Sequence, residues 1–244
     1  MKKKLIYLIA FTLTLPLFAQ QQQLRRLNFA SDFQTVPVMA NTTGIGGAEF
    51  QSYVALLNPT SSAFTVDVTL FDANGTERDA TISLAAGEQK TYTNFLEDVF
   101  GFEGGGAVTF RSADGAKRFV ISTQVTTGNY STQVDVLEFP GSNSRSFAAG
   151  VTVDSTSRTN IGCFNQSDAQ NAVTAKILDK SGQLTLGTIN LSLPANAWAQ
   201  TSVGTVVSDG VVQFDPSEAA VCYAVVVNNL TNDGRYVSAA EYTP

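Results

Sequence analysis

Histidine is missing from the sequence, and its absence removes several classes of chemistry. None of the 244 residues is a histidine. Ser-His-Asp and Cys-His catalysis, histidine-ligated zinc and a histidine pH switch are therefore excluded. Glycosidase chemistry needs only two carboxylates, so composition leaves that class open. Most of the carboxylates, however, fall in turns or at exposed strand positions, where solvated surface is their usual role. We therefore expect a protein that is not an enzyme and requires no cofactor.

Charge is also scarce, and basic charge in particular. Only 15% of the residues are charged, and 15 Lys+Arg stand against 21 Asp+Glu for a net charge of −6. The few basic residues are scattered along the chain rather than grouped. Nucleic acids and anionic membrane surfaces require a basic patch, so neither is an expected partner.

The longest mainly apolar stretch of the sequence lies at the start of the chain, and no other run approaches the length of a membrane span. Three lysines precede an apolar stretch over residues 5–18, and Ala19 then stands before a run of glutamines. This is the pattern of a signal peptide over residues 1–19, with an uncleaved N-terminal anchor as the alternative. The stretch is too short for a convincing transmembrane helix, so the mature chain is expected to have no transmembrane segment. We predict export through the general secretory route to the cell surface or the medium, with a mature net charge of −9 after the loss of three lysines.

Cysteine occurs twice, at Cys163 and Cys222. In an exported protein an isolated pair of cysteines predicts a disulfide more readily than a metal site or a redox centre. Two buried free thiols are the alternative. A disulfide between these positions closes a loop of 59 residues.

The remaining pattern is that of β-strands joined by tight turns. Residues 64–70 alternate apolar and polar side chains, as do residues 80–84, and both predict strands with one buried face. The sequences Asp72-Ala73-Asn74-Gly75 and Asp179-Lys180-Ser181-Gly182 supply the glycine that a tight hairpin needs. Residues 94–100 have helical spacing instead and predict a short helix. The expected fold is an all-β arrangement of antiparallel sheets.

The pattern appears twice. Residues 54–58 and 71–75 are matched by residues 161–165 and 178–182, each pair at a spacing of 107 residues. We therefore predict two tandem β-sandwiches, over residues 36–140 and 145–244, preceded by a flexible arm over residues 20–35. In this alignment Cys163 corresponds to Leu56 and Cys222 lies near the counterpart of Phe119. The first unit is thus expected to bring Leu56 and Phe119 together by apolar contact.

The chain resembles a tandem immunoglobulin-like β-sandwich module of exported bacterial proteins. The residues that carry the resemblance are Val36-Pro37-Val38, the glycines of residues 44–47 and the strand that ends in Leu57-Asn58-Pro59, together with residues 158–162 and 228–233 of the second copy. The resemblance implies a pair of antiparallel sandwiches and no activity. The chain departs from antibody domains, because Trp198 stands too far after Cys163 to be the tryptophan expected on the next strand.

Three local features have competing interpretations. Trp198, the only tryptophan, could stack on a sugar or anchor a partner, or it could cover the end of a sandwich or the seam between the two units. Its counterpart in the first copy is Gln89, which suggests an exposed position. The Asp72 turn and residues 232–234 resemble fragments of calcium loops but lack the closing glutamate, so hairpin chemistry explains them better. The glycines of residues 44–47 precede a predicted strand rather than a helix, which argues against a phosphate-binding loop.

These observations favour a structural or interaction protein in surface adhesion, matrix or extracellular assembly. Its expected partner is a protein or a glycan at the cell exterior, with self-association through exposed strand edges as one mechanism and the N-terminal arm as one donor. The alternative is a carbohydrate-binding accessory module that uses Trp198 as its contact.

Overall fold

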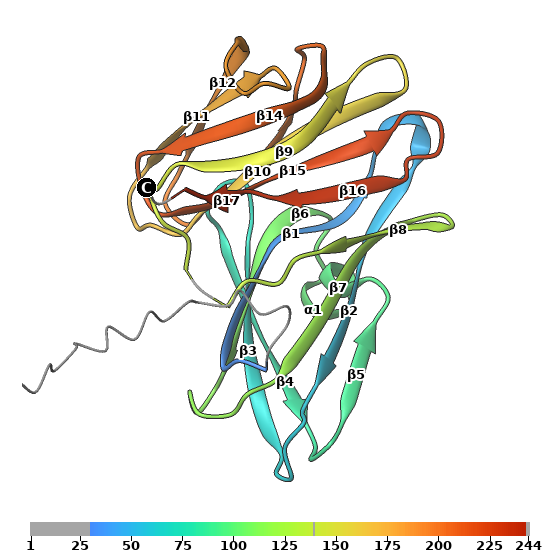
Figure 1. The fold of residues 1–244 in the computed structure, drawn as a ribbon. Coiled ribbons are helices and arrows are strands. Elements are labelled where there is room, and N and C mark those ends of the chain that lie inside the picture. Colours follow the sequence, from blue (N-terminus) through green and yellow to red (C-terminus); the bar gives the residue numbers. More distant parts are fainter. Residues whose placement is uncertain (1–29, 139, 243–244) are drawn as a thin grey trace, which may run out of the picture.

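The computed structural model describes residues 30–138 and 140–242, which form an all-β molecule of antiparallel sheets in a sandwich-like arrangement (Figure 1). The predicted fold class is confirmed. The predicted signal peptide over residues 1–19 and most of the predicted arm lie outside the described residues. Among the described residues, no helix is long and apolar enough to cross a membrane.

The part of the chain from residue 33 to residue 134, called the first half below, forms two sheets around one core. Its elements are β1 (Phe33–Thr43), η1 (Ile45–Gly47), β2 (Glu49–Leu57), β3 (Phe64–Phe71), β4 (Glu77–Leu84), β5 (Gln89–Tyr92), α1 (Phe95–Phe100), β6 (Gly104–Ser112), β7 (Val120–Thr127) and β8 (Tyr130–Val134). One sheet has the order β4-β3-β6-β1, and the other has the order β5-β2-β7-β8. The two sheets join where Asn41 to Thr43 of β1 pair with β2.

The second half, residues 146–241, has β9 (Ser146–Val153), β10 (Ser157–Asn165), β11 (Asn171–Leu178), β12 (Thr185–Leu193), β13 (Trp198–Ser202), β14 (Val207–Pro216), β15 (Ala220–Asn228), β16 (Gly234–Ser238) and β17 (Ala240–Glu241). Its sheets have the orders β12-β11-β14-β9-β17 and β13-β10-β15-β16. Apart from β17, the strand order within each sheet therefore matches that of the strands eight places earlier in the chain, but the pairing of β1 with β2 has no counterpart between β9 and β10 in the described residues.

A buried asparagine occupies the same place in both halves. The Asn58 side-chain amide donates to the carbonyl oxygens of Ser62 and Ala85, both at 2.8 Å. The Asn165 amide donates to the carbonyl oxygens of Ala169 and Pro194 at 2.8 and 2.6 Å. Both side chains are fully buried, so each asparagine satisfies two carbonyl groups that water does not reach.

The first strand begins earlier than the sequence suggested. β1 starts at Phe33, Ser31 already forms a bridge with Phe119, and Gln34 and Thr35 are buried. The prediction of a flexible arm up to residue 35 is therefore wrong for its last residues. The sequence concealed this because Pro37 interrupts the pattern. β1 shifts register between Val36 and Met39, and an irregularity of this kind accommodates a residue without an N–H.

The short helix and the hairpin turns agree with the sequence analysis. α1 spans Phe95–Phe100 and ends at Gly101, whose φ of 58° is left-handed. The strand that follows β13 in the second half begins at Val207 without a helix between them. Gly75 and Gly182 close the two predicted hairpins with φ of 76° and 71°, a conformation that favours glycine.

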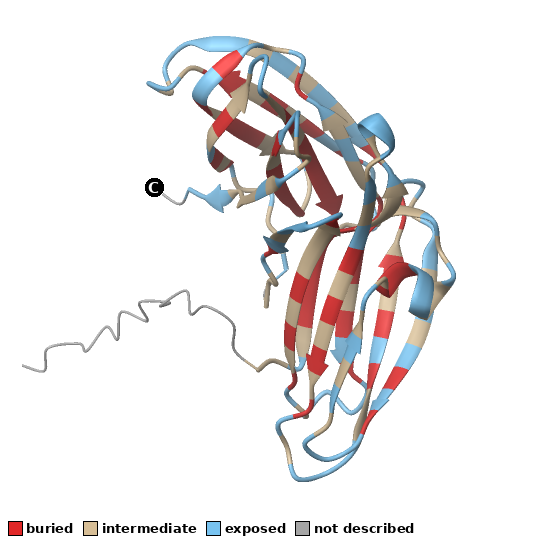
Figure 2. Ribbon diagram, turned by 90° about the vertical axis from the view of Figure 1, so that its right-hand side faces the viewer, coloured by how far each residue is buried: buried red, intermediate tan, exposed pale blue. Residues whose placement is uncertain are grey.

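The central strands β10 and β15 of the sheet β13-β10-β15-β16 carry buried residues on both faces, and this determines where the two halves meet. On β15, Cys222 and Ala224 belong to the core of the second half, whereas Tyr223 between them belongs to the core of the first. Because successive side chains of a strand point to opposite faces, one face covers the core of the second half and the other covers the first half. Figure 1 shows β15 and β16 above the first half, and Figure 2 shows the buried residues continuing from one half into the other.

Candidate functional site

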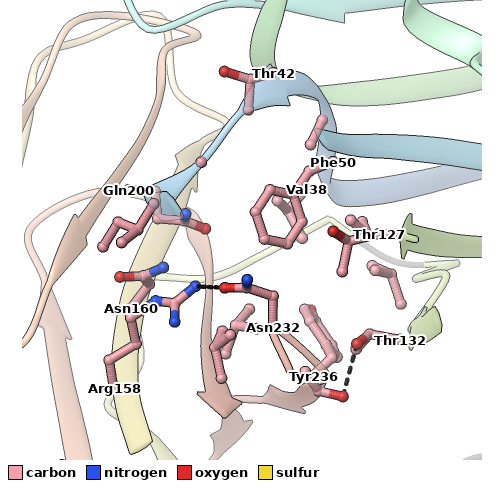
Figure 3. A pocket seen from close by; sticks show the side chains of 18 of the residues that line it. Val38, Thr42, Phe50, Thr127, Thr132, Arg158, Asn160, Gln200, Asn232 and Tyr236 are labelled. Atoms are coloured by element: carbon pink, nitrogen blue, oxygen red, sulfur yellow. Dashed lines mark hydrogen bonds between the residues drawn. The ribbon is translucent and has the colours of Figure 1, made fainter. Parts of the chain in front are cut away.

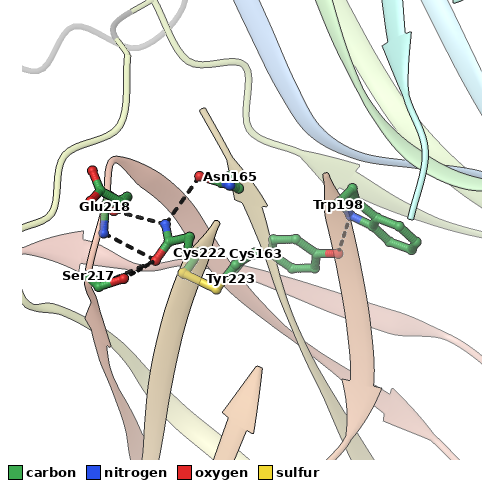
Figure 4. The surroundings of a disulfide bond; sticks show 8 residues. Cys163, Asn165, Trp198, Ser217, Glu218, Cys222 and Tyr223 are labelled. Carbon is green, nitrogen blue, oxygen red and sulfur yellow. Dashed lines mark hydrogen bonds between the residues drawn. A yellow bond between two sulfur atoms is a disulfide. The ribbon is translucent and has the colours of Figure 1, made fainter. Parts of the chain in front are cut away.

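The two cysteines form a disulfide, as predicted. Cys163 on β10 and Cys222 on β15 are bonded, with their Cα atoms 4.1 Å apart. They stand directly opposite each other in the antiparallel register, so the disulfide connects neighbouring strands of one sheet. Both residues are buried, at 0% and 4% exposure, on the face that covers the core of the second half (Figure 4). The disulfide therefore stabilises the sheet that lies between the two halves.

The first half carries an apolar pair in the same register, but with a partner other than the expected one. Leu56 stands opposite Ile121, two residues beyond Phe119. The three side chains belong to one buried cluster. Leu56 and Phe119 therefore lie in the same core, while the residue directly opposite Leu56 is Ile121, because the sequence alignment between the copies slips in the loop before β7.

Trp198 lies in the seam between the halves and packs against the core of the first half. Its ring sits over Gly105 of β6, where a Cβ atom would come within 2.6 Å of the indole. Its Nε1–H donates to the Tyr223 hydroxyl at 3.0 Å (Figure 4). Trp198 and Gln89 do occupy equivalent positions, opposite Phe164 and Leu57, but Gln89 is exposed. The indole is thus engaged within the protein, as in the seam interpretation of this residue.

Further contacts across the seam join turns of one half to strands of the other. The Phe71 and Phe164 rings lie with centroids 5.0 Å apart. The Trp198 backbone N–H donates to the Asp72 carbonyl oxygen at 3.1 Å. On the opposite side, the Thr132 hydroxyl of β8 donates to the Gly234 carbonyl oxygen of β16 at 2.7 Å.

The turn at Asp72 has the chemistry of a hairpin. One carboxylate oxygen of Asp72 accepts the N–H groups of Asn74 and Thr76 at 2.9 and 3.0 Å, and the other pairs with Arg78 at 3.3 Å. Over the described part of the chain, no group of three or more Asp, Glu, Cys or His side chains is placed to hold a metal ion. The local hydrogen bonds account for Asp72 without a calcium ion.

A cavity of about 380 Å³ opens in the seam where the packing of the two halves is incomplete (Figure 3). The first half contributes β1, β2, β7 and β8, and the second half contributes β10, β13, β15 and β16. Val38, Phe50, Val125, Val134 and Val225 supply much of its apolar surface. Threonine, serine, asparagine and glutamine side chains supply uncharged polar groups. Cavities of this size and mixed lining are typical of small-ligand sites.

Arg158 supplies the charge in this cavity. Its guanidinium donates to the side-chain oxygen of Asn232 at 2.7 Å (Figure 3) and to that of Asn229 at 3.2 Å. Burial lowers the pKa of Arg158 from its ordinary value, and arginine nevertheless stays protonated near neutral pH. Within the described residues, no aspartate or glutamate lines the cavity and Arg158 forms no ion pair. Its positive charge is therefore held by neutral groups.

Large apolar side chains stand exposed around the mouth of the cavity. Ile45 of η1 and Tyr130 of β8 line the cavity and are 72% and 42% exposed. Leu230, 90% exposed, lies in the same turn as the two asparagines that hold Arg158. Grouped exposed apolar residues mark places where a protein meets a ligand or partner.

The outer strand β12 is a second unusual surface. β12 pairs with β11 on one side, and no described strand pairs with its other side. No charged residue occurs between Lys180 and Asp209. Leu184 and Leu186, at 59% and 39% exposure, lie at its start, and Val206 on the neighbouring loop is 74% exposed. The corresponding outer strand of the first half, β4, carries Glu77, Arg78 and Asp79 instead.

The sequence analysis did not single out Arg158 as a binding residue, the cavity, or the uncharged edge of β12, although it predicted a strand over residues 188–193. One signal could have indicated the seam, since residues 220–227 of β15 are apolar without interruption. A strand covered on one face only alternates, so an unbroken apolar strand indicates two covered faces. The long stretch without charge around β12 was equally visible.

No match was found among the curated proteins. One solved structure with some similarity is Bacteroides uniformis β-glucuronidase 2 covalently bound to cyclophellitol-6-carboxylate aziridine, at 11% identity and a TM-score of 0.19. The alignment covers 79% of this chain and 24% of that one. A TM-score this low carries no argument about fold or function. Residues 39–236 match the model of a family of unknown function, DUF5719, and the chain belongs to this family.

Proposed function

We propose that the protein is an exported, non-enzymatic structural protein that assembles with copies of itself outside the cell through the edge of β12. The observation that carries the proposal is the uncharged outer strand β12 with Leu184, Leu186 and Val206 exposed beside it. An open strand edge presents unpaired N–H and C=O groups, which a strand from another molecule satisfies by extending the sheet.

The contrast with β4 supports this assignment of β12. Proteins commonly protect outer strands from pairing by placing charged side chains on them. β4 has three charged residues over Glu77–Leu84, and β12 has none over Thr185–Leu193. Two molecules that pair β12 with β12 in antiparallel fashion would form a symmetric dimer, in which each contributes the same surface.

We also infer that the two halves are copies of one immunoglobulin-like unit. Their strand orders agree, and Asn58 and Asn165 make the same hydrogen bonds. The pairing of β1 with β6 resembles that of strands B and E, and the order β2-β7-β8 resembles strands C, F and G of immunoglobulin domains. Duplication would supply two similar outer strands, of which one kept its charges and the other lost them.

Assembly is testable by light scattering coupled to size-exclusion chromatography, on the chain from residue 20 over a series of concentrations. The wild-type protein should increase in mass with concentration. Asn190→Lys places a charge on the exposed side of β12 and should keep the protein monomeric. The matched control is Thr81→Lys on β4, which stands opposite Asp67 as Asn190 stands opposite Thr174. A wild-type protein that stays monomeric, or an Asn190→Lys variant that assembles normally, would contradict the proposal.

Export is tested separately. The full-length chain should be recovered outside the cytoplasm with its N-terminus near Gln20 by mass spectrometry. A chain that starts at Gln20 after an initiator methionine should remain in the cytoplasm. Recovery of the full-length protein from the cytoplasm with residues 1–19 intact would exclude this localisation.

A further inference from the structure

The cavity between the halves has the features of a binding site rather than of a packing defect. Both halves build it, and its walls include apolar side chains from β1, β7, β8 and β15. A defect in packing between apolar surfaces would be lined by apolar groups alone. Here a charged guanidinium and several uncharged polar groups face the same space (Figure 3).

The position of Arg158 gives the site its selectivity. Keeping a guanidinium partly buried without a carboxylate partner is costly, because neutral amide oxygens compensate its charge only in part. Asn229 and Asn232 each accept from one terminal nitrogen of the guanidinium, so they hold its orientation while leaving further N–H groups for another acceptor. An anionic group would complete this arrangement.

We propose that the cavity binds a small amphipathic carboxylate, whose apolar body lies between β1, β7 and β15 and whose carboxylate pairs with Arg158. The planar guanidinium matches a carboxylate in geometry, and the apolar walls favour a chain or ring without further charge. The exposed Ile45 and Tyr130, which line the cavity, would cover the ligand as it enters. This site lies apart from β12 and is independent of self-assembly.

Calorimetric titration with decanoate tests the proposal, with decanol as the uncharged probe of the same chain length. Decanoate should bind saturably with one molecule per chain, and decanol should bind more weakly. Arg158→Gln should weaken decanoate binding by about tenfold to a hundredfold, the range expected for a lost hydrogen bond to a charged group. Arg118→Gln, which changes an exposed arginine outside the cavity, should bind decanoate like the wild-type protein.

A second variant keeps the test decisive if Arg158→Gln disturbs folding. Ala40→Leu adds volume at a half-buried position that lines the cavity and should block decanoate and decanol alike. Thermal unfolding of each variant establishes that it is folded. The proposal is overturned if the wild-type protein shows no saturable binding, if decanol binds as tightly as decanoate, or if folded Arg158→Gln keeps full affinity. Asn190→Lys, altered only at β12, should retain decanoate binding, which separates this result from the test of assembly.

Discussion

Single buried polar residues hold loops in place in both halves. Asn58 and Asn165 each span a turn on one side and reach a carbonyl oxygen of a distant loop on the other. A backbone carbonyl group that is buried without a donor is destabilising, so these amides contribute more than their size suggests. Asn58 directly follows β2 and Asn165 is the last residue of β10, so both lie where a strand ends.

Replacing either asparagine by alanine should therefore destabilise the protein substantially. We expect Asn58→Ala and Asn165→Ala each to lower the free energy of unfolding by about 2–3 kcal/mol, since each leaves buried carbonyl groups without donors. Urea denaturation followed by circular dichroism measures the change. The exposed Asn190 is the control, and its replacement by alanine should change the stability by less than about 0.5 kcal/mol. If Asn190→Ala lowers the free energy of unfolding as much as Asn58→Ala and Asn165→Ala do, the buried hydrogen bonds are not the cause of the loss.

The buried tyrosines of the seam predict a loss of stability at alkaline pH. Burial raises the pKa of Tyr223 well above its ordinary value, and the nearby Tyr236 raises it further. The unfolded chain then releases the phenolic proton near pH 10 while the folded protein retains it, so the stability is intact below that pH and falls above it. The thermal midpoint should decline more steeply above about pH 10 in the wild-type protein than in Tyr223→Phe. Identical slopes in the two proteins would count against this cause.

At the scale of elements, the two central strands of the sheet β13-β10-β15-β16 are mostly buried. These strands, β10 and β15, carry the disulfide on one face and Tyr223 on the other. Gly162 makes room for that tyrosine, because a Cβ atom at this position would overlap the Tyr223 hydroxyl. The disulfide and the aromatic residues thus act on the same pair of strands from opposite sides.

Removing the disulfide should weaken the second half without altering the fold. The double variant Cys163→Ala/Cys222→Ala should lose about 2–4 kcal/mol of stability, the usual range for a disulfide that closes a long loop. Differential scanning calorimetry of this variant, and of the wild-type protein with and without reductant, provides the measurement. Reduced wild-type protein should approach the variant. An unchanged unfolding temperature in both would show that strand pairing alone holds β10 to β15.

Sequence patterns predicted the elements well and their surroundings poorly. Alternation over residues 64–70 and 80–84 identified β3 and most of β4. Gly75 marked the turn between them, and Gly182 marked the turn between β11 and β12. These signals are local, because a strand or hairpin depends on neighbouring residues. What covers the outer face of a strand depends on residues distant in the sequence. For this reason the comparison of Trp198 with Gln89 could not decide between an exposed position and one in the seam, and only the structure shows that Trp198 packs against the first half.

The candidate sites show the same limit. The disulfide could be predicted from the single pair of cysteines and the expected export of the chain, because neither argument depends on where the residues lie in the folded protein. The cavity requires the relative placement of both halves, since Val38 and Arg158 approach each other only after the halves have docked. No spacing along the chain encodes that placement directly.

At the scale of the whole molecule, the seam makes two similar units into one body. Three separate contacts hold the two halves together. The Trp198 ring lies over Gly105, the Phe71 ring packs against the Phe164 ring, and the Thr132 hydroxyl donates a hydrogen bond to the Gly234 carbonyl oxygen. Contacts that bury aromatic rings between units restrict their relative motion more than a short polar link does.

Trp198→Gln, which installs the residue of the equivalent position in the first half, should loosen this docking. The indole would be lost from the core of the first half, and Tyr223 would lose a hydrogen-bond donor. We expect faster proteolysis between residues 135 and 145 and a broader thermal transition than in the wild-type protein. Ser83→Gln, at an exposed position of β4 outside the seam, is the control and should leave both unchanged. If Trp198→Gln resists protease as well as the wild-type protein, the other contacts are enough to keep the two halves docked.

The double-faced sheet has a consequence for the order in which the protein matures. The chain is made from its N-terminus, so the first half is complete while Tyr223 and Trp198 have yet to be added. Before these two residues are synthesised, the apolar surface of the first half that they later bury is exposed to solvent. During that interval this surface could bind other molecules and cause aggregation. The second half, in turn, would form β15 beside an apolar surface that is already folded. The first half would then serve as a template on which the second half completes its folding.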